Sequence, residues 1–92
     1  MTVSSGEEPP ADRGSIFRMV RDHLTAELEV APEEITDATR FRDDLDADSL
    51  DLYELVMELE DTYGIAMSED EAAKIETVGA AVDFVFERLP GA

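Results

Sequence analysis

Apolar residues recur at helical spacing along most of this chain, and this period is the feature that most restricts its fold. Ile16, Val20, Leu24 and Leu28 follow one another every four residues, so they share one face of an amphipathic helix. No stretch shows the alternation of a half-buried strand, and the sequence therefore predicts an all-α fold. Two further stretches have the helical period, at Leu52, Leu55, Val56, Leu59 and Tyr63 and at Val78, Val82, Val85 and Leu89.

Residues that commonly cap helices predict where the first two helices begin and end. Ser15 is expected to cap the first helix, and Pro32 is expected to end it. The second helix should begin at the junction of Asp48 and Ser49 and end at Gly64, which is a natural residue for the position after a helix.

Similar signals predict two helices in the last third of the chain. Ser68 and Glu71 match a capping box, which opens a short helix that closes by Ile75. Thr77 is expected to cap the last helix, which Pro90-Gly91 would stop.

A long segment without helical period separates the first two helices. Ile35, Phe41 and Leu45 are its isolated apolar residues and are expected to anchor it. The predicted fold is a small irregular four-helix bundle, with three longer helices, one short helix and a long loop between helices one and two. Residues 1–13, with Ser, Gly, Glu and a Pro-Pro pair, are predicted to be a flexible tail, and the folded domain is predicted to span residues 14–90.

Net charge restricts the possible partners of the chain. The 92 residues carry a formal net charge of −17 at pH 7. Between Asp43 and Glu71 there are 12 acidic residues and no Lys or Arg. Nucleic acid and anionic membrane surfaces repel such a chain, so neither is an expected partner. The charge either keeps the domain soluble or forms a surface that attracts basic patches of other proteins.

Composition also bears on location. The chain has no cysteine, so it supplies neither disulfides nor thiol chemistry. Its first residues lack the basic start and apolar run of a secretory signal, and no stretch approaches the roughly 18 apolar residues of a membrane span. We therefore expect a cytoplasmic protein that does not insert into membranes.

The second predicted helix has two apolar faces. A helix at the edge of a small bundle buries one stripe, so the other is predicted to be exposed as a protein-binding face. For Leu50 and Tyr53, packing under the long loop is the alternative. The second stripe consists of Leu50, Tyr53 and Met57, and the acidic residues beside it are Glu54, Glu58 and Asp61.

Ser49 stands alone among carboxylates, and three kinds of chemistry can be tested on it. A serine nucleophile needs a base, but the only histidine is His23 on the first helix, and no Gly-x-Ser-x-Gly motif surrounds the serine. A calcium loop starting at Asp44 would place Ser49 where glycine is needed and Leu55 where a bidentate glutamate is needed. We therefore predict no catalytic residue and no dedicated metal site. A hydroxyl in the first turn of a helix suits covalent modification, with helix capping as the alternative.

The stretch "DADSLDLYELVMELEDTYGIAMSEDEAAKIETVGAAVDFV" resembles the acyl carrier protein family, of the freestanding kind used in fatty acid and polyketide synthesis. The motif "FRDDL" stands in the expected place, and the resemblance covers most of residues 15–89. It implies a non-catalytic carrier whose Ser49 receives 4′-phosphopantetheine from coenzyme A. Acyl groups would be held as thioesters on the thiol of this arm. The implied partners of this monomeric carrier are a phosphopantetheinyl transferase and the ketosynthase, acyltransferase and other synthase enzymes.

The sequence departs from the pattern of this family at two positions near Ser49. Asp46 stands where the family often has glycine, and Tyr53 is bulkier than the usual small aliphatic residue. A carrier of aminoacyl or other specialised cargo, and an acidic interaction module without a cofactor, are the alternative functions.

The resemblance also implies roles for individual residues. Beside Ser49, the cofactor-binding residues would be Asp48 and Leu50. Both would also belong to the docking surface, whose other residues would be Glu54, Met57, Glu58 and Asp61. An acyl pocket would be lined by Val56, Leu59, Ala72, Ile75 and Ala81, for which ordinary core packing is the alternative.

Overall fold

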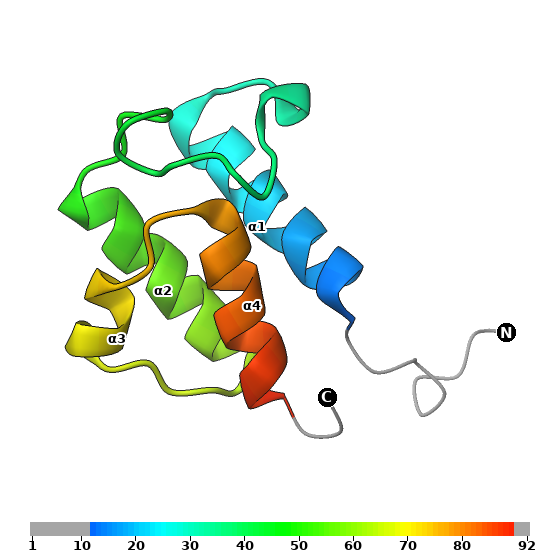
Figure 1. Ribbon diagram of the computed structural model, residues 1–92, viewed down its shortest axis with the longest axis vertical. Coiled ribbons are helices and arrows are strands. Elements are labelled where there is room, and N and C mark those ends of the chain that lie inside the picture. The colour runs from blue at the N-terminus through cyan, green and yellow to red at the C-terminus, as the bar shows by residue number, and fades with distance from the viewer. Residues whose placement is uncertain (1–11, 90–92) are drawn as a thin grey trace, which may run out of the picture.

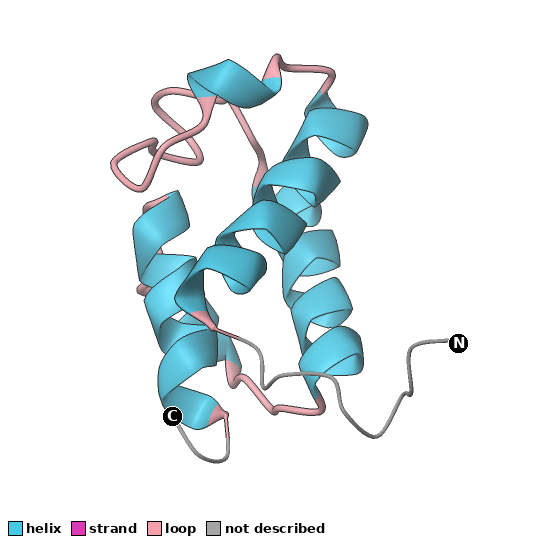
Figure 2. Cartoon of the chain, turned by 90° about the vertical axis from the view of Figure 1, so that its right-hand side faces the viewer, coloured by secondary structure: helices cyan, strands magenta, loops and turns pink. Residues whose placement is uncertain are grey.

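The computed structural model describes residues 12–89, and the regular structure in this range is helical. Figure 1 shows α4 between α1 and α2, with α3 at the edge beside α2 and the long loop across one end. Figure 2 shows the same helical architecture from the side. The prediction of a small helical bundle with one short helix is confirmed. The elements are α1 (Arg13–Leu28), the 3-10 helix η2 (Pro32–Glu34), α2 (Ser49–Tyr63), α3 (Glu69–Ala73) and α4 (Val78–Arg88).

The core lies between the three longer helices. Three of the four residues of the predicted stripe of α1, Ile16, Val20 and Leu24, are at most 1% exposed, and the fourth, Leu28, is half-buried against the core. Burying each such side chain stabilises the fold by about 1.5–3 kcal/mol. The most extensive helix contact is between α1 and α4. From the other helices the core receives Leu55, Leu59, Val78, Ala81, Val82 and Val85.

Helix α1 begins earlier than predicted. Its N-cap is Asp12, whose carboxylate accepts a hydrogen bond from the backbone N–H of Ser15 at 2.8 Å. The hydroxyl of Ser15 accepts one in return from the backbone N–H of Asp12 at 3.2 Å. The prediction that Ser15 is the cap was therefore wrong, because the carboxylate three residues earlier fills that position. Asp12 and Arg13, which were predicted to lie in the flexible tail, therefore form the start of α1, and residues 1–11 of the predicted tail lie outside the described residues.

The end of α1 also differs from the prediction. The helix stops at Leu28, because Glu29 takes the left-handed conformation with φ of 59°. Its backbone N–H still donates to the carbonyl of Thr25 at 3.0 Å, which closes the last turn. Pro32 does not end α1 but opens η2, a position that suits proline because its missing N–H has no helical partner there.

The remaining helix starts are as predicted. Helix α2 is capped by Asp48 and ends at Gly64, which has φ of 66°. Ser68 caps α3, and Thr77 caps α4 by accepting a hydrogen bond from the third residue of that helix. Helix α4 runs to Arg88, and the predicted stop at Pro90-Gly91 lies outside the described residues.

The long loop is held against the start of α4. Its predicted apolar anchors Ile35, Phe41 and Leu45 are 4%, 1% and 9% exposed. The backbone N–H of Phe41 donates to the carbonyl of Glu76 at 3.1 Å, and that of Val78 donates to the carbonyl of Thr39 at 2.9 Å. These contacts fix the path of the chain as it enters α2.

Helix α3 has five residues, too few to be stable on its own, and Arg88 of α4 holds it. The guanidinium of Arg88 pairs with the carboxylate of Glu71 and lies 4.3 Å from the centre of the Phe84 ring. It also donates to the carbonyl of Ala66 at 3.3 Å. The position of α3 is therefore set by α4.

None of the helices within residues 12–89 is both long enough and apolar enough to cross a membrane.

Candidate functional site

Ser49 is the first residue of α2, and its side chain does not cap the helix because neighbouring aspartates do. The carboxylate of Asp48 accepts a hydrogen bond from the backbone N–H of Asp51 at 3.0 Å. The carboxylate of Asp51 accepts one from the backbone N–H of Asp48 at 3.1 Å. Because these two aspartates satisfy the helix start, Ser49 is not the capping residue and its side chain is exposed.

The capping contact also fixes the charge of Asp48. The hydrogen bond from the backbone N–H of Asp51 is the main cause that lowers the pKa of Asp48 below its ordinary 3.8. Arg42, whose charge favours the carboxylate form, contributes to the same shift. Asp48 is therefore ionised at neutral pH and cannot act as a proton donor to Ser49.

The backbone just before Ser49 bears on Asp46, which stands where the acyl carrier family that the sequence resembles often has glycine. Asp46 has φ of 57°, in the left-handed region that glycine adopts without strain. Aspartate tolerates this region better than most residues. The turn therefore keeps the geometry for which a glycine is suited.

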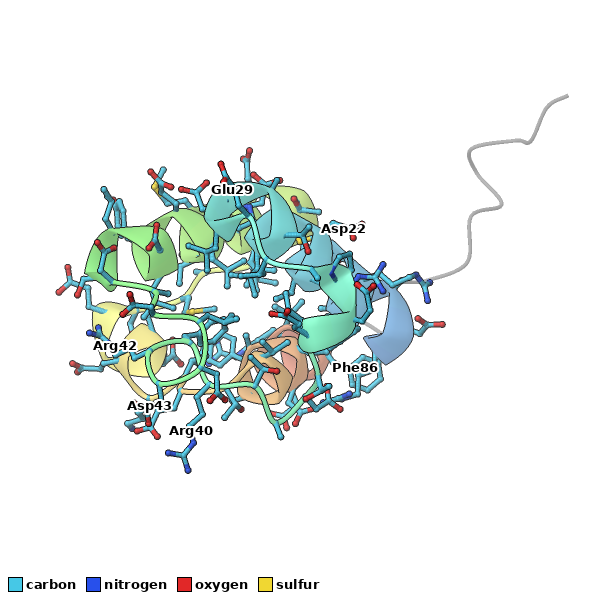
Figure 3. The ribbon with its side chains drawn as sticks, turned by 90° about the horizontal axis from the view of Figure 1, so that it is seen from above. Asp22, Glu29, Arg40, Arg42, Asp43 and Phe86 are labelled. Atoms are coloured by element: carbon cyan, nitrogen blue, oxygen red, sulfur yellow. The ribbon has the colours of Figure 1, made fainter. Side chains whose placement is uncertain are left out.

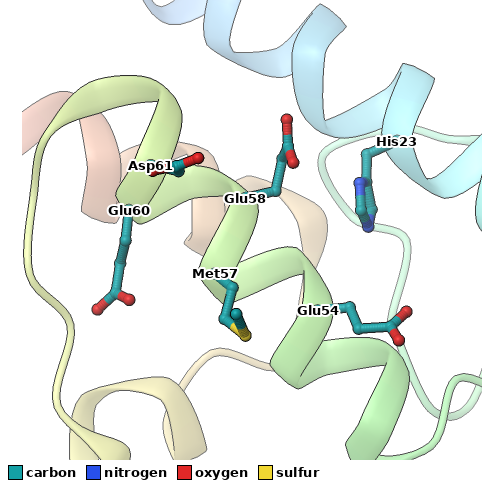
Figure 4. A pocket seen from close by; sticks show the side chains of 6 residues that line it. All are labelled: His23, Glu54, Met57, Glu58, Glu60 and Asp61. Carbon is teal, nitrogen blue, oxygen red and sulfur yellow. The ribbon is translucent and has the colours of Figure 1, made fainter.

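The side chain that contacts Ser49 comes from the loop and was not singled out from the sequence. Arg42 Nη2 donates to Ser49 Oγ at 3.2 Å. The two residues are seven positions apart, beyond the spacing of neighbours within one helix, so periodicity gives no signal for this contact. His23 does not lie beside Ser49: it projects from α1 toward the side of α2 that faces α1 (Figure 4).

A hollow of about 560 Å³ begins at Ser49 and runs between α2 and α3. Two of the predicted pocket residues, Val56 and Ala72, line it. The helical period could have indicated more of the lining residues on α2, because Leu52 lies one turn before Val56 and Tyr53 lies one turn before Met57. The lining residues that the sequence analysis did not assign to a pocket include Leu52, Tyr53, Met57, Met67 and Ala73.

The other predicted pocket residues lie apart from this hollow. Ile75 lines a neighbouring hollow of about 360 Å³, which shares Arg42, Leu52 and Ala72 with the first. Leu59 and Ala81 are each 1% exposed in the core and line neither hollow. For these two residues the core-packing alternative describes their surroundings, because both point into the contact between the longer helices.

The predicted second stripe of α2 is exposed. Leu50 is 62% exposed, Tyr53 61% and Met57 49%, so the alternative of packing under the loop was wrong for Leu50 and Tyr53. Glu58 and Asp61 are exposed beside this stripe. The two stripes separate because residues three and four apart share a helix face, whatever the tertiary context.

On the other side of this stripe, α2 faces α1. A hollow of about 630 Å³ there is lined by His23 of α1 and by Glu54, Met57 and Glu58 of α2. Figure 4 shows Glu54 below the ring of His23 and Glu58 directed toward α1. The residues predicted to dock partners therefore lie on one continuous face, which runs from the exposed apolar stripe toward α1.

Three carboxylates meet where α1 approaches the start of α2. Oxygens of Glu27, Asp51 and Glu54 all lie within 4.8 Å of one another. The hydrogen bond with Glu27, and then the charge of Glu27, raise the pKa of Glu54 above its ordinary 4.5. The sequence analysis did not foresee this cluster, because Glu27 reaches α2 only through the packing of the two helices.

Comparison with known proteins identifies the family. Residues 18–85 match the family model described as "Phosphopantetheine attachment site". The chain is 46% identical over 76 residues to the acyl carrier protein of Rubrobacter xylanophilus, covering 83% of this chain and 94% of that protein. It is also 46% identical over 70 residues to the acyl carrier protein of Lactobacillus acidophilus, covering 76% of this chain and 88% of that protein. This chain belongs to the acyl carrier protein family.

A solved structure supports the same assignment. The acyl carrier protein from Enterococcus faecalis, in a study of its high thermal stability, superposes with a TM-score of 0.74 at 38% identity. The match covers 84% of this chain and 98% of that one. The predictions of an acyl carrier, of the 4′-phosphopantetheine cofactor and of a helical bundle are confirmed by these matches. The same matches do not favour the alternative of an interaction module without a cofactor.

The residues present fit this cofactor. A phosphopantetheine arm needs an accessible hydroxyl, and Ser49 offers one at the rim of a hollow between α2 and α3. A phosphodiester is anionic, and the guanidinium that contacts this hydroxyl is the chemical group suited to it. When bound, the arm supplies the thiol that the cysteine-free chain lacks.

Proposed function

We propose that Ser49 is the residue that carries 4′-phosphopantetheine, and that the arm holds acyl intermediates as thioesters for fatty acid synthesis. The observation that carries this assignment is the capping of α2 by Asp48. Because Asp48 satisfies the backbone of the first turn, the hydroxyl of Ser49 is left exposed at the rim of the hollow. A serine needed as a cap would lose that contact on modification.

Attachment needs a separate enzyme. It forms a bond between Ser49 Oγ and a phosphorus of coenzyme A, breaks the pyrophosphate bond and releases adenosine 3′,5′-bisphosphate. The hydroxyl proton must go to a base, and His23 lines a different hollow from Ser49. The neighbouring carboxylate of Asp48 is held by the backbone of Asp51. A transferase would therefore supply the base, and the chain itself would act as a carrier.

The hollow beside Ser49 is proposed as the shelter for an acyl chain. Its walls include Leu52, Val56 and Met67, and its volume of about 560 Å³ is in the range of small-molecule sites. Ala72 and Ile75 extend it toward the second hollow. Leu59 and Ala81 lie beneath these walls in the closed core, and a chain would reach them only if the longer helices moved apart.

The exposed face of α2 is proposed as the docking surface for the transferase and for synthase enzymes, including ketosynthase and acyltransferase. The face combines exposed apolar groups with a border of carboxylates, and such a surface suits a partner with a basic patch around an apolar centre. Charge would speed the encounter, and the apolar groups would hold the complex. Its members are Leu50, Tyr53, Glu54, Met57, Glu58 and Asp61.

The attachment residue can be tested by intact mass. The purified chain is incubated with coenzyme A, magnesium and a broad-specificity phosphopantetheinyl transferase, beside the variants Ser49→Ala and Ser68→Ala. Ser68 is a matched control, since it also lies at a helix start and lines the same hollow. One phosphopantetheine increment on the wild type and on Ser68→Ala, but none on Ser49→Ala, is the expected result. An increment on folded Ser49→Ala would show that another residue carries the arm.

A further inference from the structure

Arg42 occupies a fixed position next to the proposed attachment residue. Its neighbour Phe41 is 1% exposed and Leu45 is 9% exposed, so the turn between them is anchored at both ends. The carbonyl of Arg42 accepts a hydrogen bond from the backbone N–H of Asp46 at 3.1 Å, which closes the turn. The guanidinium then reaches forward, and its Nη2 donates to Ser49 Oγ at 3.2 Å.

The guanidinium of Arg42 forms no ion pair within residues 12–89, although its charge favours the ionised form of Asp48. Ion pairs in that range are formed by Arg13, Arg21, Arg40 and Arg88. Arg40, two residues earlier, pairs with Asp43 at 3.1 Å, and Figure 3 shows it extending away from the domain. Figure 3 shows Arg42 beside α3 instead. Although carboxylates surround it in the sequence, Arg42 contacts a neutral hydroxyl and keeps most of its five N–H donors for another group.

An anion joined to Ser49 would meet these donors. Phosphorus bonds directly to the serine oxygen, so the remaining phosphate oxygens lie around the atom that Arg42 already contacts. Guanidinium and phosphate match in charge and in the paired geometry of donors and acceptors. Asp46, Asp48 and Asp51 would repel the same phosphate. Among residues 12–89, Arg42 is the cationic side chain that contacts this serine.

We propose that Arg42 is a positioning residue that binds the phosphate of the phosphopantetheine arm and sets where the arm begins. This inference rests on the proposed attachment at Ser49. Arg42 lines both hollows beside α3, so a phosphate held by it starts the arm at the rim that the two hollows share. Repulsion by the aspartates would otherwise direct the phosphate away from the domain.

The experiment measures how the thermal midpoint changes on loading. Wild type, Arg42→Gln, Arg42→Lys and the matched control Arg40→Gln are prepared without the arm and with it. Loading is driven to completion with excess transferase and checked by intact mass. Removing Arg42 should lower the midpoint of the loaded form by about 2–4 °C more than that of the unloaded form at low salt. Arg42→Lys should keep part of this difference, and Arg40→Gln should show none.

Two further readouts exclude a merely structural role. The difference should vanish at about 1 M salt, where screening reduces the Debye length to about 3 Å. In nitrogen-15 spectra, the Nε–Hε signal of Arg42 should shift on loading while that of Arg40 stays in place. Equal midpoint changes in wild type and Arg42→Gln, or an unmoved Arg42 signal in a protein loaded at Ser49, would overturn the role of Arg42 alone. A missing mass increment at Ser49 would instead overturn the attachment proposal, and this one with it.

Discussion

The contact between Gly79 and the long loop allows a prediction in which the structure reverses the expectation from helix propensity. Gly79 is buried as the second residue of α4, and its backbone N–H donates to the carbonyl of Asp37 at 2.9 Å. A Cβ atom added there would lie 2.9 Å from that carbonyl oxygen and 3.1 Å from the Cβ of Asp37. The first distance is shorter than side-chain carbons show in real proteins, and the obstacle is backbone.

Two opposing free energies decide the sign of Gly79→Ala. Helix propensity favours alanine by at most about 1 kcal/mol, and by less in a first turn. Forcing a methyl group against backbone costs about 1–3 kcal/mol, and stretching the hydrogen bond to Asp37 costs about 0.5–1.5 kcal/mol more. Subtracting the propensity gain from these two costs leaves a net loss of about 1–4 kcal/mol in the free energy of unfolding, and each kcal/mol lowers the thermal midpoint by roughly 4–8 °C.

Gly14 provides a matched control. It is also the second residue of its helix, but the atoms nearest to an added Cβ are 3.6 Å and 3.7 Å away and belong to side chains. Gly14→Ala should therefore leave the midpoint unchanged or raise it slightly. Thermal and urea unfolding followed by circular dichroism measures both variants. A Gly79→Ala protein as stable as the wild type would show that the loop at Asp37 yields at no cost, and the close-contact argument would fail.

Two other predictions concern α2. Glu27→Gln should raise the thermal midpoint relative to wild type at about pH 7 but not at about pH 4, as a pH series of thermal scans would show. The sign follows because the raised pKa of Glu54 gives a contribution to stability that is present at low pH and is lost as the pH rises through that pKa. An equal difference in thermal midpoint between Glu27→Gln and wild type at both pH values would contradict this prediction. Met57→Ala, at a half-exposed position, should leave the midpoint nearly unchanged and slow transfer of the arm to Ser49, whereas Leu59→Ala should cost about 2–5 kcal/mol of stability. Unfolding of Met57→Ala would place that side chain in the core.

The sequence predicts the local features of the fold well because their causes are local. Asp48 and Gly64 bound α2 through contacts made within one turn of the helix ends. The exposure of Leu50 and Tyr53 follows from the helical period, since a helix that buries one stripe turns the opposite side chains to solvent. The start of α1 was missed for the same local reason. Asp12 and Ser15 are both good caps, and they act together in one capping box, so either residue fits the pattern.

The hollow between α2 and α3, which we propose as the shelter of an acyl chain, could not be predicted with the same accuracy, because its shape depends on where α3 lies. Val56 and Leu59 are both apolar residues of α2, yet one lines the hollow and the other is closed in the core. The difference arises because Val56 lines the hollow beside α3, and α3 is held in place by the contact of Arg88 with Glu71. That pair joins residues 17 positions apart, a separation over which periodicity and capping carry no information.

Charge shows the same division between what composition gives and what folding adds. Composition presents the stretch from Asp43 to Glu71 as uniformly acidic, which would leave a phosphate on Ser49 without any cation. Folding changes this locally, because Arg42 lies just outside the stretch and the turn ending at Leu45 directs its guanidinium back to the serine. The acidic border of α2 would then attract basic partners over a distance, while Ser49, the proposed attachment residue, has a cation beside it. A carrier with both features can be strongly acidic and still hold an anionic group.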